Sequence, residues 1–204
     1  MRLQDLGTDT AHLREAPIES ERVWRGSFLD VRRDRVSLPD GSVSHREYIV
    51  HPGAVMIVAL LDDERLVVER QWRFPIGEAV LELPAGTLEA GEPPIACAVR
   101  ELFEETGYRA AEWARAGVTH NAIAYSTEGI EVWFARGLSA GERRLDAGEF
   151  LDVFEATAEQ LEAAALAGEL TDAKSLVGLL WLRNWRAGRW PLEWQPAPDW
   201  RQCR

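Results

Sequence analysis

Residues 86–108 read GTLEAGEPPIACAVRELFEETGY, and this stretch decides the fold prediction. Its apolar residues recur at helical spacing, which predicts a short and partly buried helix. At about 3.6 residues per turn, Glu101 and Glu105 fall on one face of that helix, and Glu104 lies one turn from Glu101. Three carboxylates therefore crowd one edge of the predicted helix.

This acidic edge favours a bound cation. Like charges at helical spacing repel, although the loss on an exposed helix is only about 0.2–0.5 kcal/mol per pair. A divalent cation between the carboxylates reverses the sign of that interaction. Mg²⁺ prefers hard oxygen ligands, keeps several waters and also takes phosphate oxygens. The cluster therefore predicts magnesium-assisted attack on a phosphate chain.

The same stretch resembles the box of the Nudix hydrolases. That box runs Gly, five residues, Glu, seven residues, Arg-Glu, an aliphatic residue, any residue, Glu-Glu, any residue, Gly and an apolar residue. This chain carries every fixed residue: Gly86, Glu92, Arg100, Glu101, Glu104, Glu105 and Gly107. Tyr108 stands where an aliphatic residue is commoner. The resemblance implies an α/β fold, the Nudix α/β/α sandwich with a mixed sheet, preceded by a small antiparallel β N-terminal piece.

Roles for the box residues follow from the resemblance. It implies three direct ligands of Mg²⁺, with Mn²⁺ as the alternative ion: Glu101, Glu105 and the carbonyl oxygen of Ala85. Glu104 would support the metal-bound waters, and Arg100 would lie behind the ligands as a catalytic residue. An equally physical interpretation makes Arg100 the i+4 ion-pair partner of Glu104, and Glu92 an acid in the first helical turn.

A second stretch, residues 67–86, reads VVERQWRFPIGEAVLELPAG and resembles the ADP-ribose pyrophosphatases within the family. The likeness lies in a Gln-aromatic-Arg triplet and a Glu-x-Pro-Ala-Gly run. Arg73 offers a planar fork for phosphate oxygens, with a solvated surface arginine as the competing interpretation. Glu82 is either an acid beside the metal or a buried structural partner.

Residues 44–55, SHREYIVHPGAV, are similar to the N-terminal region of the same subfamily. The resemblance implies a homodimer in which this region pairs with the second subunit and the two subunits share their sites. It further implies that Phe28 stacks on adenine, that Arg46 covers the other face of the base, and that Glu47 accepts from the exocyclic amine. The competing interpretations are Phe28 in the core, and Arg46 and Glu47 as surface charges without a role in binding.

Residues 119–138, THNAIAYSTEGIEVWFARGL, resemble the loop that brings another acid to the site in this subfamily. Glu128 stands at the matching position and is the candidate general base, with Glu104 as its competitor. Asn121 replaces a proline that the family associates with ADP-ribose preference. That difference leaves the reaction type unchanged but weakens the assignment of ADP-ribose as the substrate.

Composition narrows the class of protein. The chain has 204 residues, of which 46% are apolar, enough to bury a core in one domain with or without a small appendage. Its 34 acidic and 23 basic residues give a net charge of −11, which disfavours binding to nucleic acid or to anionic membranes. The first residues carry no apolar segment for export or membrane insertion, so a cytoplasmic protein is expected. Cys97 and Cys203 show no ligand spacing, and Cys97 is expected to be a small buried residue.

Two domains are predicted along the chain. Residues 1–50 are expected to form an N-terminal β region for dimerisation and base recognition, with a hairpin around residues 39–41, and residues 51–204 the Nudix hydrolase domain. A final helix is expected to begin after Asp172, its cap, with Lys174 on a solvated face. Tryptophans near the C-terminus are expected to cover the core or a subunit interface: Trp185, Trp190, Trp194 and Trp200.

The sequence thus predicts a Mg²⁺-dependent Nudix pyrophosphatase that hydrolyses a nucleoside diphosphate sugar. ADP-ribose, split into AMP and ribose 5-phosphate, is the first candidate substrate. GDP-mannose or another sugar nucleotide is the alternative. A function of a different class is a sensor on the same scaffold that binds a nucleotide sugar without hydrolysing it, and the complete set of box acids argues against that sensor.

Overall fold

A computed structural model describes residues 9–198 of the chain. The described residues form two compact units. The N-terminal unit contains residues 9–51 and 122–128, and the box unit contains residues 52–121 and 129–198. Among the described residues, no helix is both long enough and apolar enough to cross a membrane.

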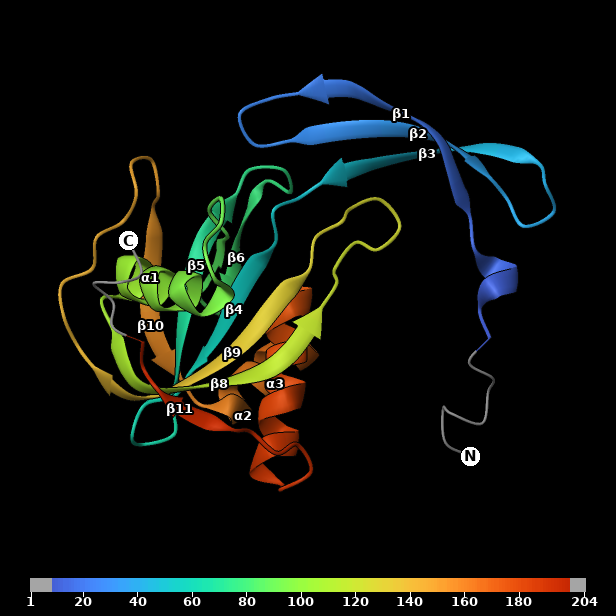
Figure 1. The fold of residues 1–204 in the computed structure, drawn as a ribbon. Helices are drawn as coiled ribbons and strands as arrows, with labels where there is room; N and C mark the ends of the chain where they lie inside the picture. The colour runs from blue at the N-terminus through green and yellow to red at the C-terminus, as the bar shows by residue number, and fades with distance from the viewer. Residues whose placement is uncertain (1–8, 199–204) are drawn as a thin grey trace. The chain divides into compact units, whose positions relative to one another are not determined.

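The N-terminal unit is an antiparallel sheet in the order β1-β2-β3 (Figure 1). Its strands are β1 (Ala16–Arg25), β2 (Asp30–Ser37) and β3 (Val43–Val50), and a short 3-10 helix, η2 (Ala11–Leu13), precedes them. The turn between β2 and β3 contains Gly41, whose φ of 83° suits a residue without a side chain. The predicted hairpin around residues 39–41 is confirmed.

The N-terminal unit also contains a loop from much later in the chain. Residues 122–128 hydrogen-bond to the end of β3. The Ile49 N–H donates to the Tyr125 carbonyl at 2.9 Å, and the Thr127 N–H donates to the Ile49 carbonyl at 3.0 Å. The His51 N–H donates to Thr127 Oγ1 at 2.9 Å. The loop thus satisfies backbone groups at the outer edge of β3, which would otherwise stay open to other strands.

The box unit contains two sheets (Figure 1). A five-stranded sheet has the order β11-β8-β9-β4-β7, formed by β11 (Trp194–Pro196), β8 (Arg109–Thr119), β9 (Ile130–Ser139), β4 (Ala54–Ala59) and β7 (Ala85–Thr87). β4 and β9 are parallel and the other neighbours are antiparallel, so this sheet is mixed. A three-stranded antiparallel sheet has the order β10-β5-β6, formed by β10 (Leu151–Ala156), β5 (Leu66–Arg73) and β6 (Glu78–Glu82).

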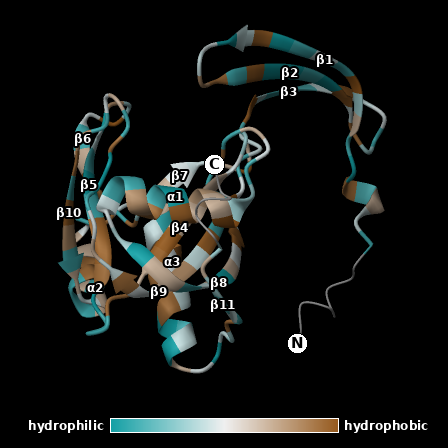
Figure 2. Ribbon diagram, turned by 60° about the vertical axis from the view of Figure 1, so that its left-hand side comes forward, coloured by the Kyte–Doolittle hydropathy of each residue, from teal (hydrophilic) through white to brown (hydrophobic). Residues whose placement is uncertain are grey.

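Three helices complete the described part of the box unit: α1 (Pro94–Thr106), α2 (Ala158–Ala167) and α3 (Ala173–Arg186). Every residue of β4 is buried, because apolar layers cover both of its faces. Val55 and Ile57 pack in one core with residues of α1, whereas Met56 and Val58 pack in a second core with residues of α2 and α3. Figure 2 shows the hydrophobic residues concentrated along these central strands. The predicted α/β/α sandwich with a mixed sheet is confirmed.

Helix α3 begins where the sequence predicts. Asp172 accepts from the Ser175 N–H at 3.0 Å and so caps the first turn. The prediction of a solvated Lys174 was wrong, because this side chain is buried and its ammonium group pairs with Glu82 and, at 3.0 Å, with Asp172. Glu82 lies 92 residues earlier in the chain, so no local pattern reveals the pair.

Described tryptophans near the C-terminus cover the second core, the one packed with α2 and α3. Covering the core was one of the two predicted roles, and a subunit interface was the other. Trp185 and Trp194 both pack against that core and meet edge to face at 5.8 Å between ring centroids. Trp181, also in contact with the core, stacks on Trp190 at 4.9 Å. Trp200 lies outside the described residues.

Candidate active site

Helix α1 carries the box glutamates. Glu105 lies on its buried face, and Glu101 and Glu104 are half-buried. The helix ends at Gly107, whose φ is 78°. A Cβ atom on Gly107 would lie 2.5 Å from the carbonyl oxygen of Gly141, so the last fixed position of the box requires glycine. Cys97 on the same helix is fully buried, as predicted, and Cys203 lies outside the described residues.

Strand β7 contributes Ala85 and Gly86 to the same place. The Ala85 N–H donates to Glu105 Oε2 at 3.2 Å. A Cβ atom on Gly86 would lie 1.9 Å from the carboxyl carbon of Glu101, so glycine alone permits this close approach. The fold thus brings together the three residues predicted as metal ligands. Because the contact with Ala85 is through its N–H, ligation by its carbonyl oxygen stays a prediction.

Arg100 connects the acids of the box. Its Nε and Nη2 atoms donate to Glu92, each at 2.9 Å. Its Nη1 atom donates to Glu101 at 2.7 Å and to Glu104 at 3.2 Å. Burial alone would raise the pKa of Glu92, but the bonds and charge of Arg100, together with the hydrogen bond from the Glu89 N–H, outweigh burial and lower it. The predicted Arg100–Glu104 pair is present, and Arg100 also holds Glu101 beside β7, so the structural role of this arginine supports the site directly.

Burial changes the protonation of the acids around α1. It raises the pKa of Glu101 to about 7, although Arg100 works against that rise. Burial, followed by the charge of Glu69, raises the pKa of Glu105. Burial, followed by the charge of Glu82, raises the pKa of Glu69. For Glu69, Glu101 and Glu105 all to be ionised at neutral pH, additional positive charge is therefore needed nearby.

Two acids of this group were not identified as site residues from the sequence. Glu69 on β5 is 4% exposed, and among the described residues its Oε1 atom has no hydrogen-bond partner. Glu149, in the loop before β10, adds its charge to the effect of burial on the pKa of Glu105. Glu69 follows the buried run of β5, and an acid at the end of such a run is the signal that could have found it.

The donor atoms around Ala85 suit a hard divalent cation. They are carboxylate oxygens, and the charge of Glu69 acts on one of these acids, Glu105. Within residues 9–198, the buried Glu69 Oε1 atom has no hydrogen-bond partner. In the part of the chain that the structure describes, no three acidic, histidine or cysteine side chains are already arranged as a metal-binding set. Glu101 instead accepts from Arg100, and Glu105 accepts from the Ala85 N–H. The oxygen-only donors and the uncompensated buried acids nevertheless fit Mg²⁺ or Mn²⁺.

Arg73 binds a carboxylate of the protein itself. Its Nε and Nη2 atoms donate to Glu82 at 2.5 Å and 2.8 Å, and Lys174 pairs with the same carboxylate. Burial would raise the pKa of Glu82, but Arg73 and Lys174 outweigh it and lower the pKa. Glu82 is therefore a buried structural partner, and phosphate binding by Arg73 stays a prediction.

Phe28 in the N-terminal unit is not a core residue. Its side chain is 59% exposed. The ring meets the imidazole of His51 edge to face, with 5.5 Å between centroids. An exposed aromatic ring held by one neighbour can stack on a planar ligand, so the predicted role in adenine binding stays open.

Arg46 and Glu47 have separate partners. Arg46 Nε donates to Glu15 at 2.9 Å, and Arg33 Nη2 donates to Glu47 at 2.9 Å. Consecutive residues of a strand point to opposite faces of the sheet, so the two side chains leave β3 in opposite directions. Both side chains are exposed and bond to other surface charges, so the interpretation of Arg46 and Glu47 as surface charges stays open beside their predicted role in base binding.

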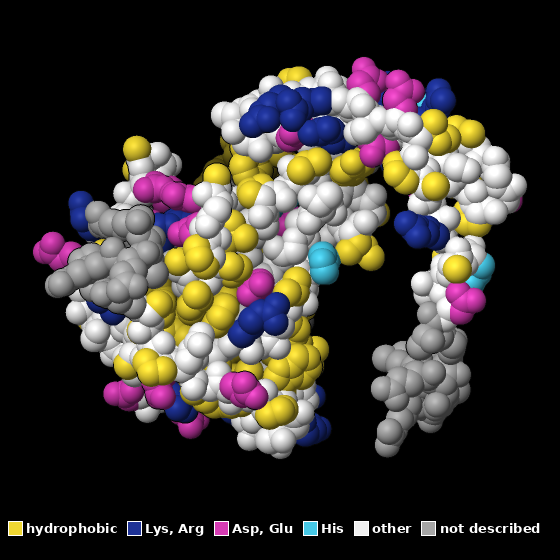
Figure 3. Space-filling model, in the orientation of Figure 1, with side chains coloured by type: hydrophobic (Ala, Val, Ile, Leu, Met, Phe, Trp, Pro, Cys, Tyr) yellow, Lys and Arg dark blue, Asp and Glu magenta, His cyan; other side chains and the backbone are white. Residues whose placement is uncertain are grey.

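Arginines also gather around Asp30 in the N-terminal unit. Arg22, Arg25 and Arg32 reach this carboxylate at 3.1, 3.8 and 2.9 Å. Figure 3 shows a group of Lys and Arg side chains over β1 and β2. Three guanidinium groups face one carboxylate, so this part of the surface is locally positive although the chain carries a net charge of −11.

Glu128 belongs to the loop that closes the edge of β3. Its carboxylate lies 3.6 Å from His51 Nε2, and its N–H donates to Ser126 Oγ at 3.1 Å. The side chain is half-buried. Its role as the general base stays a prediction.

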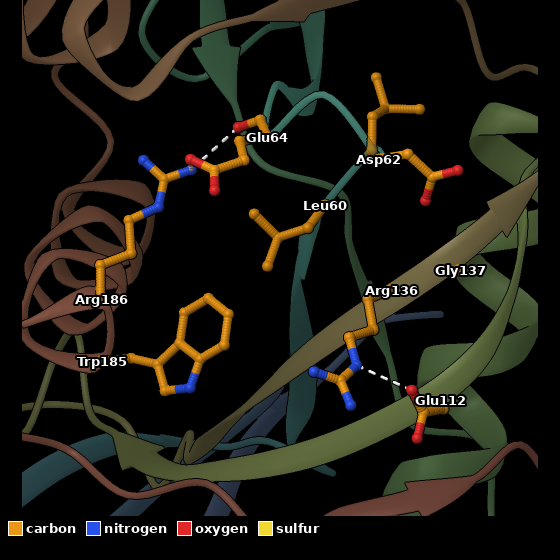
Figure 4. Close-up of a pocket in the computed structure, with 9 residues that line it drawn as sticks. Leu60, Asp62, Glu64, Glu112, Arg136, Gly137, Trp185 and Arg186 are labelled. Carbon is orange, nitrogen blue, oxygen red and sulfur yellow. Dashed lines mark hydrogen bonds and ion pairs between the residues drawn. The ribbon is translucent and has the colours of Figure 1, made fainter. Parts of the chain in front are cut away.

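The box unit also contains a pocket of about 660 Å³ that none of the predicted site residues line. Figure 4 shows Trp185 and Leu60 between two ion pairs, Arg136–Glu112 and Arg186–Glu64. The nitrogen–oxygen distances of these pairs are 2.8 and 3.5 Å. Both arginines of this pocket are paired with acids that also line it.

We expect the metal-free protein to lose stability as the pH rises through about 7, the raised pKa of Glu101. The unfolded chain would bind the Glu101 proton with a pKa near 4.5, so the folded state holds more protons between these values. That stabilisation is complete below the unfolded pKa and is lost above the folded one. A shift of this size corresponds to about 3 kcal/mol.

The melting temperature in a chelating buffer at pH 5 and pH 8 measures this effect. Glu101→Gln removes the titrating group, so its melting temperature should depend less on pH than that of the unchanged protein. Equal pH dependence in the two proteins would contradict the assignment. A divalent cation should restore stability at pH 8 more in the unchanged protein than in Glu101→Gln.

Comparison with protein families matches both parts of the chain. A family model described as NUDIX domain matches residues 50–177. A second model, described as nucleoside diphosphate sugar hydrolase N-terminal domain, matches residues 17–49. Together the two models span the N-terminal sheet, the box and the start of α3.

Individual relatives extend over most of the chain. A protein of Bacillus subtilis (strain 168) named ADP-ribose pyrophosphatase is 36% identical over 173 residues, which is 84% of this chain and 94% of the relative. A protein of Bacillus methanolicus named methanol dehydrogenase activator is 35% identical over 173 residues, 83% of this chain and 92% of the relative. A crystal structure of an ADP compounds hydrolase has a TM-score of 0.77 at 23% identity, covers 87% of this chain and 97% of its own, and shows the same fold.

Proposed function

Because this chain belongs to the Nudix family, we propose that it hydrolyses the diphosphate bond of a nucleoside diphosphate sugar, with ADP-ribose converted to AMP and ribose 5-phosphate. The observation that carries the proposal is the approach of Glu101 and Glu105 to Ala85 and Gly86. The match of residues 17–49 to a nucleoside diphosphate sugar hydrolase domain and the name of the Bacillus subtilis relative support this substrate class.

The proposed cofactor is Mg²⁺, with Mn²⁺ as the alternative. Glu101, Glu105 and the carbonyl oxygen of Ala85 would hold the ion, and Glu104 would hold its waters. When bound, the cation would neutralise the diphosphate and lower the pKa of a bound water. Arg100 would keep Glu101 in place through the bond already present between them.

The remaining residues would position the substrate and move the proton. Water attacks a phosphorus atom in line, and the bond from phosphorus to the bridging oxygen breaks with its electron pair going to the leaving phosphate. Glu128 would take the proton from water, with Glu104 as the competing base. The Nε and Nη2 atoms of Arg73 donate to Glu82, which leaves its Nη1 atom to donate to a phosphate oxygen.

The N-terminal region would read the base. We propose residues 1–50 for base recognition and dimerisation and residues 51–204 for hydrolysis. Phe28 would stack on adenine and Arg46 would cover its other face. Glu47 leaves β3 on the opposite side, so it would reach the base from the second subunit of a homodimer whose subunits share their sites. The proposed partners include neither nucleic acid nor membrane, and the proposed location is the cytoplasm.

Phe28→Ala is expected to raise KM for ADP-ribose by about fivefold or more, because stacking on a base contributes about 1–3 kcal/mol. The value of kcat should change less, since the ring does not touch the diphosphate in this proposal. Steady-state kinetics measure both constants. Val43→Ala, at an exposed apolar position of β3, is the matched control. An unchanged KM in Phe28→Ala would remove this residue from the site.

A substrate comparison tests the proposed function. The purified protein is incubated with Mg²⁺ and either ADP-ribose or GDP-mannose, and release of AMP or GMP is followed by chromatography. Faster release of AMP supports the proposal. Faster release of GMP would favour the alternative that Asn121 raises. Binding of ADP-ribose without turnover of either compound would move the assignment to a nucleotide-sugar sensor.

A further inference from the structure

Glu69 lies on strand β5, whose residue Val67 packs in the same core as residues of helix α1. Residues 67 and 69 share one face of the strand, because side chains alternate between faces. Val67 packs in the core that contains Cys97 and Leu102 of α1. Val153, the cross-strand partner of Glu69 on β10, packs against the same core. The side chain of Glu69 therefore leaves β5 on the side of α1.

Glu105 occupies the buried face of α1. It is 5% exposed and lies one helical turn beyond Leu102, which packs in the same core as Val67. Glu69 itself is 4% exposed. Two buried carboxyl groups thus project from β5 and α1 into the layer between these two elements.

Within residues 9–198, neither Glu69 nor Glu105 forms an ion pair, and the Oε1 atom of Glu69 has no hydrogen-bond partner. The nearest basic groups of this region, Arg73 and Lys174, both bond to Glu82, the neighbour of Glu69 on β6. Glu105 accepts from the backbone N–H of Ala85.

Burying a carboxylate without a partner is unfavourable by several kcal/mol, which is why buried charges are normally paired or coordinate a metal. An extra positive charge between β5 and α1 would remove that penalty. Carboxylate oxygens select hard divalent ions such as Mg²⁺ and Mn²⁺. We propose that Glu69 and Glu105 together hold a divalent cation between strand β5 and helix α1, so that Glu69 is a metal ligand that the box does not contain.

This inference rests on the proposed metal-dependent hydrolysis but assigns a residue outside the box. Mn²⁺ binding to the full chain, measured without substrate by electron paramagnetic resonance and calorimetry, tests it. Glu69→Gln keeps the size of the side chain and removes its charge. It should bind one Mn²⁺ fewer per chain, or bind the ion about 10-fold or more weakly, the lower end of the loss for residues that support a metal.

Glu78→Gln is the matched control, since Glu78 lies on β6 in the same sheet and is exposed. It should bind Mn²⁺ as the unchanged protein does. Glu69→Gln should stay folded in chelator, with a melting temperature no lower than that of the unchanged protein, because the uncompensated charge is gone. A lower melting temperature with unchanged Mn²⁺ binding would show a purely structural role and overturn the inference.

A double variant makes the test specific for a shared ion. If Glu69 and Glu105 hold the same cation, combining Glu69→Gln with Glu105→Gln should weaken Mn²⁺ binding no more than Glu105→Gln alone. Losses that add would mean two separate ions and would overturn the shared site. Hydrolysis of ADP-ribose by the unchanged protein is measured separately, so failure of the proposed function and failure of this inference give different results.

Discussion

Glu105→Gln is expected to abolish Mg²⁺-dependent hydrolysis while the chain stays folded. Replacing a residue that only supports a ligand already lowers metal affinity or activity by about 10–100-fold, so losing a ligand should exceed about 100-fold. Glutamine has nearly the same volume, and its side-chain oxygen can still accept from the Ala85 N–H. Turnover of ADP-ribose at increasing Mg²⁺ concentration, with circular dichroism as the folding control, measures the effect.

Glu131→Gln is the matched control for charge. Glu131 lies on β9 and pairs with Arg115 at 2.9 Å on a partly exposed surface. Its replacement should leave turnover near that of the unchanged protein, because surface ion pairs contribute little. Near-normal turnover in Glu105→Gln at saturating Mg²⁺ would exclude Glu105 from the metal site.

Glu82→Gln is expected to lower the free energy of unfolding by about 3 kcal/mol, the lower end for breaking a buried ion pair. The carboxylate is 4% exposed and takes bonds from both Arg73 and Lys174. Lys174 would keep Asp172, at 3.0 Å, as its remaining acidic partner. For a chain of this length the loss corresponds to a melting temperature lower by about 6–12 °C.

Thermal unfolding followed by circular dichroism measures this change. The control is Glu112→Gln, which removes one partner of the exposed Arg136–Glu112 pair and should shift the melting temperature little. Equal shifts in the two variants would contradict the assignment of Glu82 as a buried structural partner. A loss of turnover in Glu82→Gln without a loss of stability would instead favour its role beside the metal.

The box helix could be predicted from the sequence because its signals are local. The apolar spacing, the paired prolines and Gly107 all lie within α1 or directly beside it. Gly86, which Glu101 approaches, lies on β7, the strand just before this helix. The cap at Asp172 is equally local, since its partner is Ser175. Such features depend on backbone geometry that the neighbouring residues determine.

The features that sequence reasoning missed are non-local. Lys174 is buried because its ammonium group pairs with Glu82 at the end of β6. The position of Lys174 in a helix does not reveal a partner on a distant strand. In the sequence, Glu69 is part of the stretch 67–86, which resembles the subfamily as a whole. Its burial depends instead on the core that β5 shares with α1. The resemblance of residues 119–138 to a loop likewise gave no sign that residues 122–128 belong to the N-terminal unit, because that depends on their pairing with β3.

The hydrogen bonds between β3 and residues 122–128 have a consequence for biosynthesis. The ribosome releases β1, β2 and β3 first, so their hairpins can form early. The edge at Ile49 stays open until Tyr125 and Thr127 have left the exit tunnel, by which time the α1 segment has already been made. The N-terminal unit is therefore completed late in synthesis. A gene fragment that encodes only its first segment, residues 9–51 of the described chain, would lack residues 122–128 and leave the edge of β3 exposed to aggregation.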